Sequence, residues 1–260
     1  MSDGFSDDLN ACADLVRRGN PDRFRAAMAA PVSARRVLFP IYAFNVEVSR
    51  APWMTQESII AEMRLQWWRD ALEEISAGGT VRRHEVVTPL AAILDGEGAR
   101  LLDDLIVARR WDIYRDPFED AAHFDSYLTK TAAHLMLAAA RALGDATPEV
   151  VLDVGYASGL AGWLRAIPKL EEAGRMPLVD GRETAVRDLA LNGLSRLRRA
   201  RKRRADISAP ARPALLAAWQ TAGVLRRAAK YPGAVSAGAL EPAPGRSSLT
   251  LTARAMTGRW

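Results

Sequence analysis

The segment LFPIYAFN (residues 38–45) lies inside a helix that the sequence predicts from Val32 to Arg50. Pro52 closes this helix, because the residue before a proline is disfavoured in the helical region of backbone space. Pro40 lies inside the helix and predicts a kink. Apolar residues recur at three- and four-residue spacing through nearly the whole chain, and no segment keeps the alternation of a strand. We therefore expect an all-α protein.

Further helices are predicted on both sides of this segment. Thr55 is the expected N-cap of the helix that follows it, and Thr147 marks the start of another helix, which Pro168 is expected to end. A helical domain of residues 1–231 precedes a tail rich in Gly, Pro, Ser and Thr (232–260), which we expect to be partly disordered, with Trp260 able to dock. The predicted helices span residues 7–18, 21–30, 56–76, 89–94, 96–112, 121–143, 148–166, 183–204 and 213–230.

Composition is that of a folded globular protein. The chain has 260 residues, of which 49% are hydrophobic and 26% charged, and this size suits one domain. No uninterrupted apolar run approaches the roughly 18 residues of a membrane span, and the start, MSDGFSDDLN, is acidic, so we expect neither a signal peptide nor a spanning helix. The chain has a single cysteine, Cys12, which excludes an internal disulfide and a cysteine-based zinc site. This fits a cytoplasmic location. We expect Cys12 to be a small buried side chain.

Three segments, in order, resemble the squalene/phytoene synthase family. Residues 38–45 resemble the helix that leads into the family's first aspartate-rich motif, and Arg109 to Asp112 with Tyr127 resemble its middle region. The helix of the second motif and the Gly-Arg turn after it are matched without a gap by Gly155, Tyr156, Ala157, Leu160, Leu164, Arg165, Gly174 and Arg175. The resemblance implies the isoprenoid synthase fold, a bundle of helices around a central cavity.

The resemblance also implies where metal ligands would lie. In such enzymes two facing helices present carboxylates that hold magnesium ions against the diphosphates of two prenyl substrates. Carried over by position, the first motif's aspartates fall on Ser49, Arg50 and Trp53. The second motif falls on Gly162, Ala166, Lys169 and Leu170. No carboxylate remains, so we expect no catalysis and no cofactor, with Mg²⁺ needed only if the chain were an active prenyltransferase.

Two arginines beside the altered motifs leave two interpretations open. Arg50 and Arg165 can bind an anion without a metal, or they can form structural pairs with acids such as Glu47 or Asp112. Trp53 and Trp163 are expected to fill space that the family uses for metal and diphosphate. The candidates for the cavity or a ligand are therefore Tyr42, Asn45, Arg50, Trp53, Asp112, Trp163 and Arg165.

One group of acids offers a displaced metal site. Asp70, Glu73 and Glu74 follow helical spacing and would serve an active enzyme if they converged with Asp112 inside the cavity. The alternative is the solvated face of a helix, with Arg64 and Arg69 as available partners. The three histidines share no ligand spacing, and the sequence has no nucleophile elbow or glycine-rich phosphate loop.

The net charge is +5, and basic residues are concentrated in residues 196–204. There, Leu191, Leu194, Leu197 and Ala200 predict an apolar stripe below a basic face. Such a face can hold an anionic membrane, at about 1 kcal/mol per basic residue, or it can simply be solvated. Nucleic acid is not expected, because no aromatic residues are interleaved with the arginines. The expected membrane or anion surface consists of Arg198, Arg199, Arg201, Lys202, Arg203 and Arg204.

These observations support three hypotheses about function. The first is a non-catalytic relative, because its degenerate motifs resemble those of the family branch that assembles mitochondrial complex I. This resemblance implies respiratory complex subunits as partners and a peripheral position on the inner membrane. The second is a head-to-head prenyltransferase with a relocated metal site. The third is a metal-free protein that binds a prenyl lipid or prenyl diphosphate.

Overall fold

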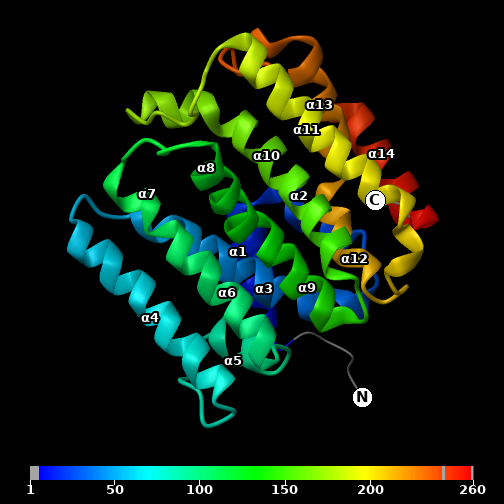
Figure 1. Cartoon of the computed structure of the whole chain (residues 1–260). Helices are drawn as coiled ribbons and strands as arrows, with labels where there is room; N and C mark the ends of the chain where they lie inside the picture. The colour runs from blue at the N-terminus through cyan, green and yellow to red at the C-terminus, as the bar shows by residue number, and fades with distance from the viewer. Residues whose placement is uncertain (1–5, 242–243, 259) are drawn as a thin grey trace.

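The computed structural model describes residues 6–241, 244–258 and 260, and within these ranges it is helical throughout, with no strand (Figure 1). The expected all-α class is confirmed. The main helices are α1 Asp7–Gly19, α2 Pro21–Met28, α3 Val32–Arg50, α4 Ser58–Ser76, α5 Val87–Ala91, α6 Gly96–Arg109, α7 Trp111–Tyr114, α8 Ala121–Leu128, α9 His134–Leu143, α10 Pro148–Glu172, α11 Glu183–Lys202, α12 Arg212–Leu215, α13 Thr221–Lys230 and α14 Pro244–Thr257.

Helix α10 lies at the centre of the bundle. It packs against α9 on one side and against α11 on the other, and α3 packs against α1 and α9. Figure 1 shows α4 at one side of the molecule and α11, α13 and α14 at the opposite side. By length and composition α10 could cross a membrane, but 61% of its apolar window is buried inside the protein, as expected of a core helix.

The helix predicted around residues 38–45 is confirmed. Helix α3 has the predicted bounds, Pro40 is buried inside it, and a short 3₁₀ turn, η1 (Ala51–Trp53), follows where Pro52 was expected to close it. The next helix begins later than predicted, at Ser58. Thr55 is not its N-cap, because the Thr55 hydroxyl oxygen accepts a hydrogen bond from the Glu57 amide at 3.1 Å and so stabilises the turn before the helix.

Other predicted helices differ in their bounds, and those over residues 96–112 and 213–230 are each divided into shorter helices. Helix α10 continues through Pro168 and ends at Glu172, and Gly174, whose φ is +75°, lies in the turn that follows. The buried side chain of Ile167 keeps this last part of α10 on the core. The single helix predicted over residues 121–143 is interrupted by a π-helical turn, η2 (Thr129–Ala133), in which the Thr131 hydroxyl donates to the Tyr127 carbonyl at 2.6 Å.

The C-terminal segment also differs from expectation. Disorder was wrong for residues 244–257, which form α14, while residues 242–243 and 259 lie outside the described part. Trp260 does dock, because its side chain is buried and its backbone oxygen accepts a hydrogen bond from Arg201 at 3.0 Å. Cys12 is fully buried as expected, and burial raises the pKa of its thiol to about 12.

Close packing of α10 on the π-helical turn depends on glycine. A Cβ atom on Gly155 would come within 2.5 Å of the Ala133 backbone, whereas a Cβ atom on Gly162 of the same helix would meet nothing within 4 Å. The backbone of η2 cannot move away as a flexible side chain could.

We predict that Gly155→Ala lowers the free energy of unfolding by about 1–3 kcal/mol, because the added methyl group overpacks the contact. Gly162→Ala is the matched control and should raise it by up to about 1 kcal/mol, since alanine favours a helix. Urea denaturation measures both. Equal effects of the two substitutions would contradict the close contact.

Candidate functional site

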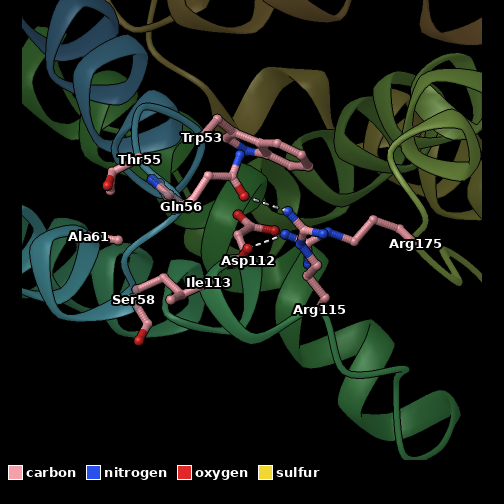
Figure 2. A pocket seen from close by; sticks show the side chains of 10 residues that line it. Trp53, Thr55, Gln56, Ser58, Ala61, Asp112, Ile113, Arg115 and Arg175 are labelled. Carbon is pink, nitrogen blue, oxygen red and sulfur yellow. Dashed lines mark hydrogen bonds between the residues drawn. The ribbon is translucent and has the colours of Figure 1, made fainter.

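One pocket, of about 320 Å³, lies between the ends of the segments that carry the altered motifs. Trp53 of η1 and Arg175, which follows α10, line it together with Asp112 of α7 and Arg115 (Figure 2). Figure 2 shows the guanidinium groups of Arg115 and Arg175 pointing into the same space. The rest of the wall consists of Pro52, Thr55, Gln56, Ser58, Ala61 and Ile113.

The positions carried over from the first motif present no metal ligand. The Ser49 hydroxyl donates to the Val46 carbonyl at 3.1 Å within its own helix. The Arg50 side chain is 54% exposed, lies 3.7 Å from Glu47, and is absent from the pocket lining. Arg50 therefore lies outside this pocket, and its structural pairing with Glu47 is the interpretation that the geometry favours.

The second motif's positions are equally unsuited to a metal. Gly162 and Lys169 are exposed on α10, and Ala166 and Leu170 are partly buried side chains without a polar atom. Magnesium requires several oxygen ligands, and a lysine ammonium repels it. Within the described residues, no group of three or more His, Cys, Asp or Glu side chains lies close enough to hold a metal ion. Mg²⁺ therefore does not fit the residues present.

The displaced carboxylates do not converge with Asp112. Asp70 accepts a hydrogen bond from Gln66 at 2.7 Å, and Glu74 is bound at 2.6 Å by Arg82, which holds the pKa of the Glu74 carboxyl below its ordinary value. Glu73 is exposed and lines a different hollow. These acids form the charged surface of α4.

Asp112 is at the centre of a buried polar network. Its carboxylate lies 2.9 Å from the Arg109 guanidinium and accepts a hydrogen bond of 2.9 Å from the Tyr127 hydroxyl. Arg109 also donates to the Tyr127 oxygen at 2.7 Å. Burial alone would lower the pKa of Arg109, but Tyr127 and Asp112 outweigh it and raise that pKa, while burial raises the pKa of Tyr127. Both groups therefore keep their protons at neutral pH.

Of the charged groups that line this pocket, Arg175 is the one with buried donor atoms that lack a hydrogen-bond partner. Its side chain is only 6% exposed, and one nitrogen, Nη2, donates to the backbone carbonyl of Asp112. The guanidinium carbon lies 4.8 Å from the ring centroid of Trp53 and 5.6 Å from that of Trp111, distances typical of cation–π contacts. Nε and Nη1 are buried without a hydrogen-bond partner, which costs about 1–3 kcal/mol for each donor. Burial lowers the pKa of Arg175, although Asp112 opposes this effect.

Arg115 adds a second positive charge at a strained position. Its φ is +60°, in the left-handed region, which is uncommon for residues other than glycine. The side chain donates to Gln56 at 3.3 Å. Arg115 and Arg175 each add a positive charge to the lining and Asp112 adds one negative charge, so the lining has a positive excess and suits an anion rather than a metal cation.

An aromatic cluster fills the interior beside the pocket. Trp111 stacks on Phe118 with their ring centroids 4.0 Å apart, and Trp163 lies 5.2 Å from Tyr127. The indole nitrogen of Trp163 donates to the Pro177 carbonyl at 2.8 Å. Trp163 thus lies in the interior, as expected. Trp53 does not, because it is 46% exposed and covers Arg175 at the rim.

The remaining predicted site residues lie outside this pocket. Arg165 lies 2.9 Å from Asp22 and 2.7 Å from Glu241, so it is paired as the structural alternative proposed, although with different acids. The buried Tyr42 hydroxyl is 3.4 Å from the Ala214 carbonyl, and burial raises its pKa to about 12. Asn45 is buried, and its side-chain oxygen has no hydrogen-bond partner.

Sequence reasoning missed the two arginines that define the pocket. Arg175 belongs to the Gly174-Arg175 turn that resembled the family, so its position was available as a signal. Its burial was not, because Trp53 and Trp111 cover it from distant parts of the chain. No feature of the sequence distinguished Arg115.

The helical bundle and the placement of the altered motifs define a protein of the isoprenoid synthase class. The sequence signature of squalene/phytoene synthase matches residues 16–239, and the chain belongs to this family. The predicted fold is therefore confirmed.

Solved structures agree on the fold. A dehydrosqualene synthase in complex with a ligand matches with a TM-score of 0.78 at 15% identity, covering 96% of this chain and 95% of that one. The squalene synthase HpnC from Alicyclobacillus acidocaldarius matches with a TM-score of 0.67 at 16% identity, covering 86% and 93%. At these identities the likeness concerns the fold alone.

The curated relatives that the chain matches are named as assembly factors and not as synthases. The assembly factor 6 homolog of NADH dehydrogenase (ubiquinone) complex I from Drosophila melanogaster is 29% identical over 166 residues, covering 60% of this chain and 50% of the relative. Assembly factor 6 from Homo sapiens is 22% identical over 172 residues, covering 60% and 48%. The chain thus spans about half the length of the curated relatives it matches.

We predict that Asp112→Asn lowers the free energy of unfolding by about 3 kcal/mol, because it leaves the buried Arg109 without a countercharge. Asp70→Asn, on the surface of α4, is the control and should change stability by less than about 0.5 kcal/mol. Thermal and urea denaturation measure the difference. If both variants were equally stable, Asp112 would not organise the pocket.

Proposed function

We propose that this protein is a non-catalytic member of its family that acts as an assembly factor for respiratory complex I. The observation that carries the proposal is the loss of every motif carboxylate from a preserved frame. Ser49, Arg50 and Trp53 replace one set of ligands, and the positions on α10 offer none. The names of the curated relatives support the assembly role.

The rebuilt pocket supports the same proposal. Metal-assisted departure of diphosphate requires cations held by carboxylates, and here the only carboxylate of the lining, Asp112, is bound by Arg109 and Tyr127. The aromatic cluster around Trp163 occupies interior space beside it. A protein that keeps the family fold but lacks the metal ligands that catalysis requires suits a scaffold that binds other proteins. We place its action at the membrane that holds complex I, as a peripheral protein on the cytoplasmic side of the inner membrane.

One observation favours a second candidate function. Arg175 has two buried N–H groups without partners beside the pocket, and Arg115 faces the same space. Guanidinium groups in this arrangement suit a phosphate or diphosphate without a metal. A protein that binds a prenyl phosphate without converting it is therefore the alternative to a pure scaffold.

Incubation with farnesyl and geranylgeranyl diphosphate and Mg²⁺ tests the absence of catalysis. We expect no C30 or C40 product by chromatography, because no residues hold the metal. A dehydrosqualene synthase assayed in parallel is the positive control. Coupled product that requires Mg²⁺ would contradict the proposal.

Deletion of the gene in its own organism tests the assembly role. We expect less fully assembled complex I on native gels and slower NADH oxidation by membranes, both restored by the wild-type gene. The Gly162→Ala variant should restore them equally, since that position is exposed and empty. Normal complex I levels in the deletion strain would overturn the assembly role.

A further inference from the structure

An apolar groove of about 440 Å³ lies beside α4. Ile60, Met63 and Trp67 of α4 line it, and their spacing of three and four residues places them on one face of the helix. Met54, from the turn before α4, lines it as well, and Met54 and Met63 are 52% and 68% exposed. Aromatic residues, Met and Arg are enriched at protein–protein interfaces, and this groove contains all three kinds.

The side chain of Trp67 is held in place by the residues around it. Its ring centroid lies 4.9 Å from that of Trp68, and the guanidinium carbon of Arg82 lies 4.9 Å from the ring centroid of Trp67. Glu74 in turn binds Arg82 at 2.6 Å. Because this indole already has a fixed position, little conformational entropy is lost when a partner contacts it. The two methionines have flexible side chains that can adapt to the partner's shape.

The charge that the lining of the groove leaves uncompensated is positive. Arg64 lines the groove and donates to the Met54 sulfur at 3.5 Å, and a thioether is a weak acceptor. Within the described residues, Arg64 forms no ion pair with a carboxylate. The one acid of the lining, Glu47, lies 3.7 Å from Arg50, whose charge offsets it. A partner that fills this groove is therefore expected to present an acidic residue to Arg64.

Two other occupants fit these charges less well. A second copy of the chain, docked about a two-fold axis, would bring the same lining, whose acid is already paired with Arg50. An anionic membrane would be repelled by Glu57 and Glu73, which are exposed at the start and in the last turn of α4. The described part of the chain contains no strand that a partner could extend, so a helix packed along α4 is the mode of recognition that suits the groove.

The basic surface expected from the sequence lies elsewhere. Figure 1 shows α11, which carries it, on the opposite side of the bundle from α4. This surface is also less basic than expected, because Arg199 is bound by Asp153 at 2.6 Å. Arg203 is bound by Asp206 at 2.9 Å, and Leu191, assigned to the apolar stripe, is 45% exposed. The exposed basic residues that remain are Arg198, Lys202 and Arg204. The groove on α4 is therefore separate from this surface.

We propose that the groove beside α4 binds an amphipathic helix of a partner protein. Apolar residues of that helix, at three- and four-residue spacing, contact Met54, Met63 and Trp67, and an acidic residue beside them pairs with Arg64. Such a site gives the proposed scaffold its kind of partner, and it rests on that function only in that a scaffold must bind other proteins.

Photo-crosslinking in the protein's own organism tests the occupant. Benzoylphenylalanine takes the place of Met63, and mass spectrometry identifies the segment that it joins on irradiation. We expect a segment of another protein that has apolar residues at helical spacing and an acidic residue within one turn of them. The same probe in place of Met256, which is 83% exposed on α14, should not join that segment. Crosslinks to a second copy of the chain or to lipid, or none above this control, would overturn the proposal.

Titration with a synthetic peptide of the crosslinked segment tests the charge. Arg64→Glu should weaken binding by about tenfold or more, and replacing the acidic residue of the peptide with lysine should restore it. Met54→Glu/Met63→Glu should weaken binding at least as much, because it places charges in the apolar groove.

The matched control for these variants is Leu249→Glu/Met256→Glu. It places the same charges on an apolar pair of α14 that is 75% and 83% exposed, and it should bind the peptide as the wild-type protein does. Circular dichroism confirms that all variants are folded. Equal binding by the wild-type protein and Arg64→Glu would overturn the proposal, as would loss of binding in the α14 control.

The outcomes separate this site from the proposed function. Normal complex I in the deletion strain, together with the expected crosslink and charge reversal, removes the assembly role and leaves the groove as a protein-binding site. Loss of complex I in the deletion strain, with no crosslink at position 63, removes the groove and leaves the assembly role.

Discussion

The ion pair between Arg109 and Asp112 is the interaction on which the pocket depends. It joins the end of α6 to α7, and Tyr127 of α8 binds both partners. Arg175 reaches the same residue from the loop after α10, through the Asp112 backbone carbonyl. Four segments of the chain thus meet at one aspartate. A buried ion pair of this kind adds little stability by itself, but losing one partner is costly, and this keeps the segments in register.

The charge in this pocket differs in sign from that of a site lined by carboxylates. Carboxylates that face each other attract cations and, through them, diphosphates. Here the lining offers the guanidinium groups of Arg115 and Arg175, and its carboxylate, Asp112, is bound by Arg109 and Tyr127. Trp53, at a position where the resemblance placed an aspartate, covers Arg175 with its indole ring. The same fold is therefore compatible with an anion pocket or a scaffold, and fold alone does not specify which.

Much of the fold was predictable because its signals are local. Helix α3 has the predicted bounds because its apolar spacing is regular and Pro52 ends it. Helix α10 passes Pro168 because packing of Ile167 outweighs a local rule, and α14 forms in a segment whose composition suggested disorder. The positions of the two motifs could be assigned one by one from the resemblance, and that assignment stays a prediction. The burial of Arg175 could not be predicted, since it depends on contacts between distant segments.

Calorimetric titration with farnesyl diphosphate, with and without Mg²⁺, tests most directly whether this pocket has lost its metal chemistry. A pocket organised by Arg175 and Asp112 should show no gain in affinity when Mg²⁺ is added. Binding of the diphosphate without metal would identify the pocket as an anion site, and absence of binding would leave the scaffold. Affinity that rises strongly with Mg²⁺ would show that the protein still assembles a metal–diphosphate site, and would contradict the central claim.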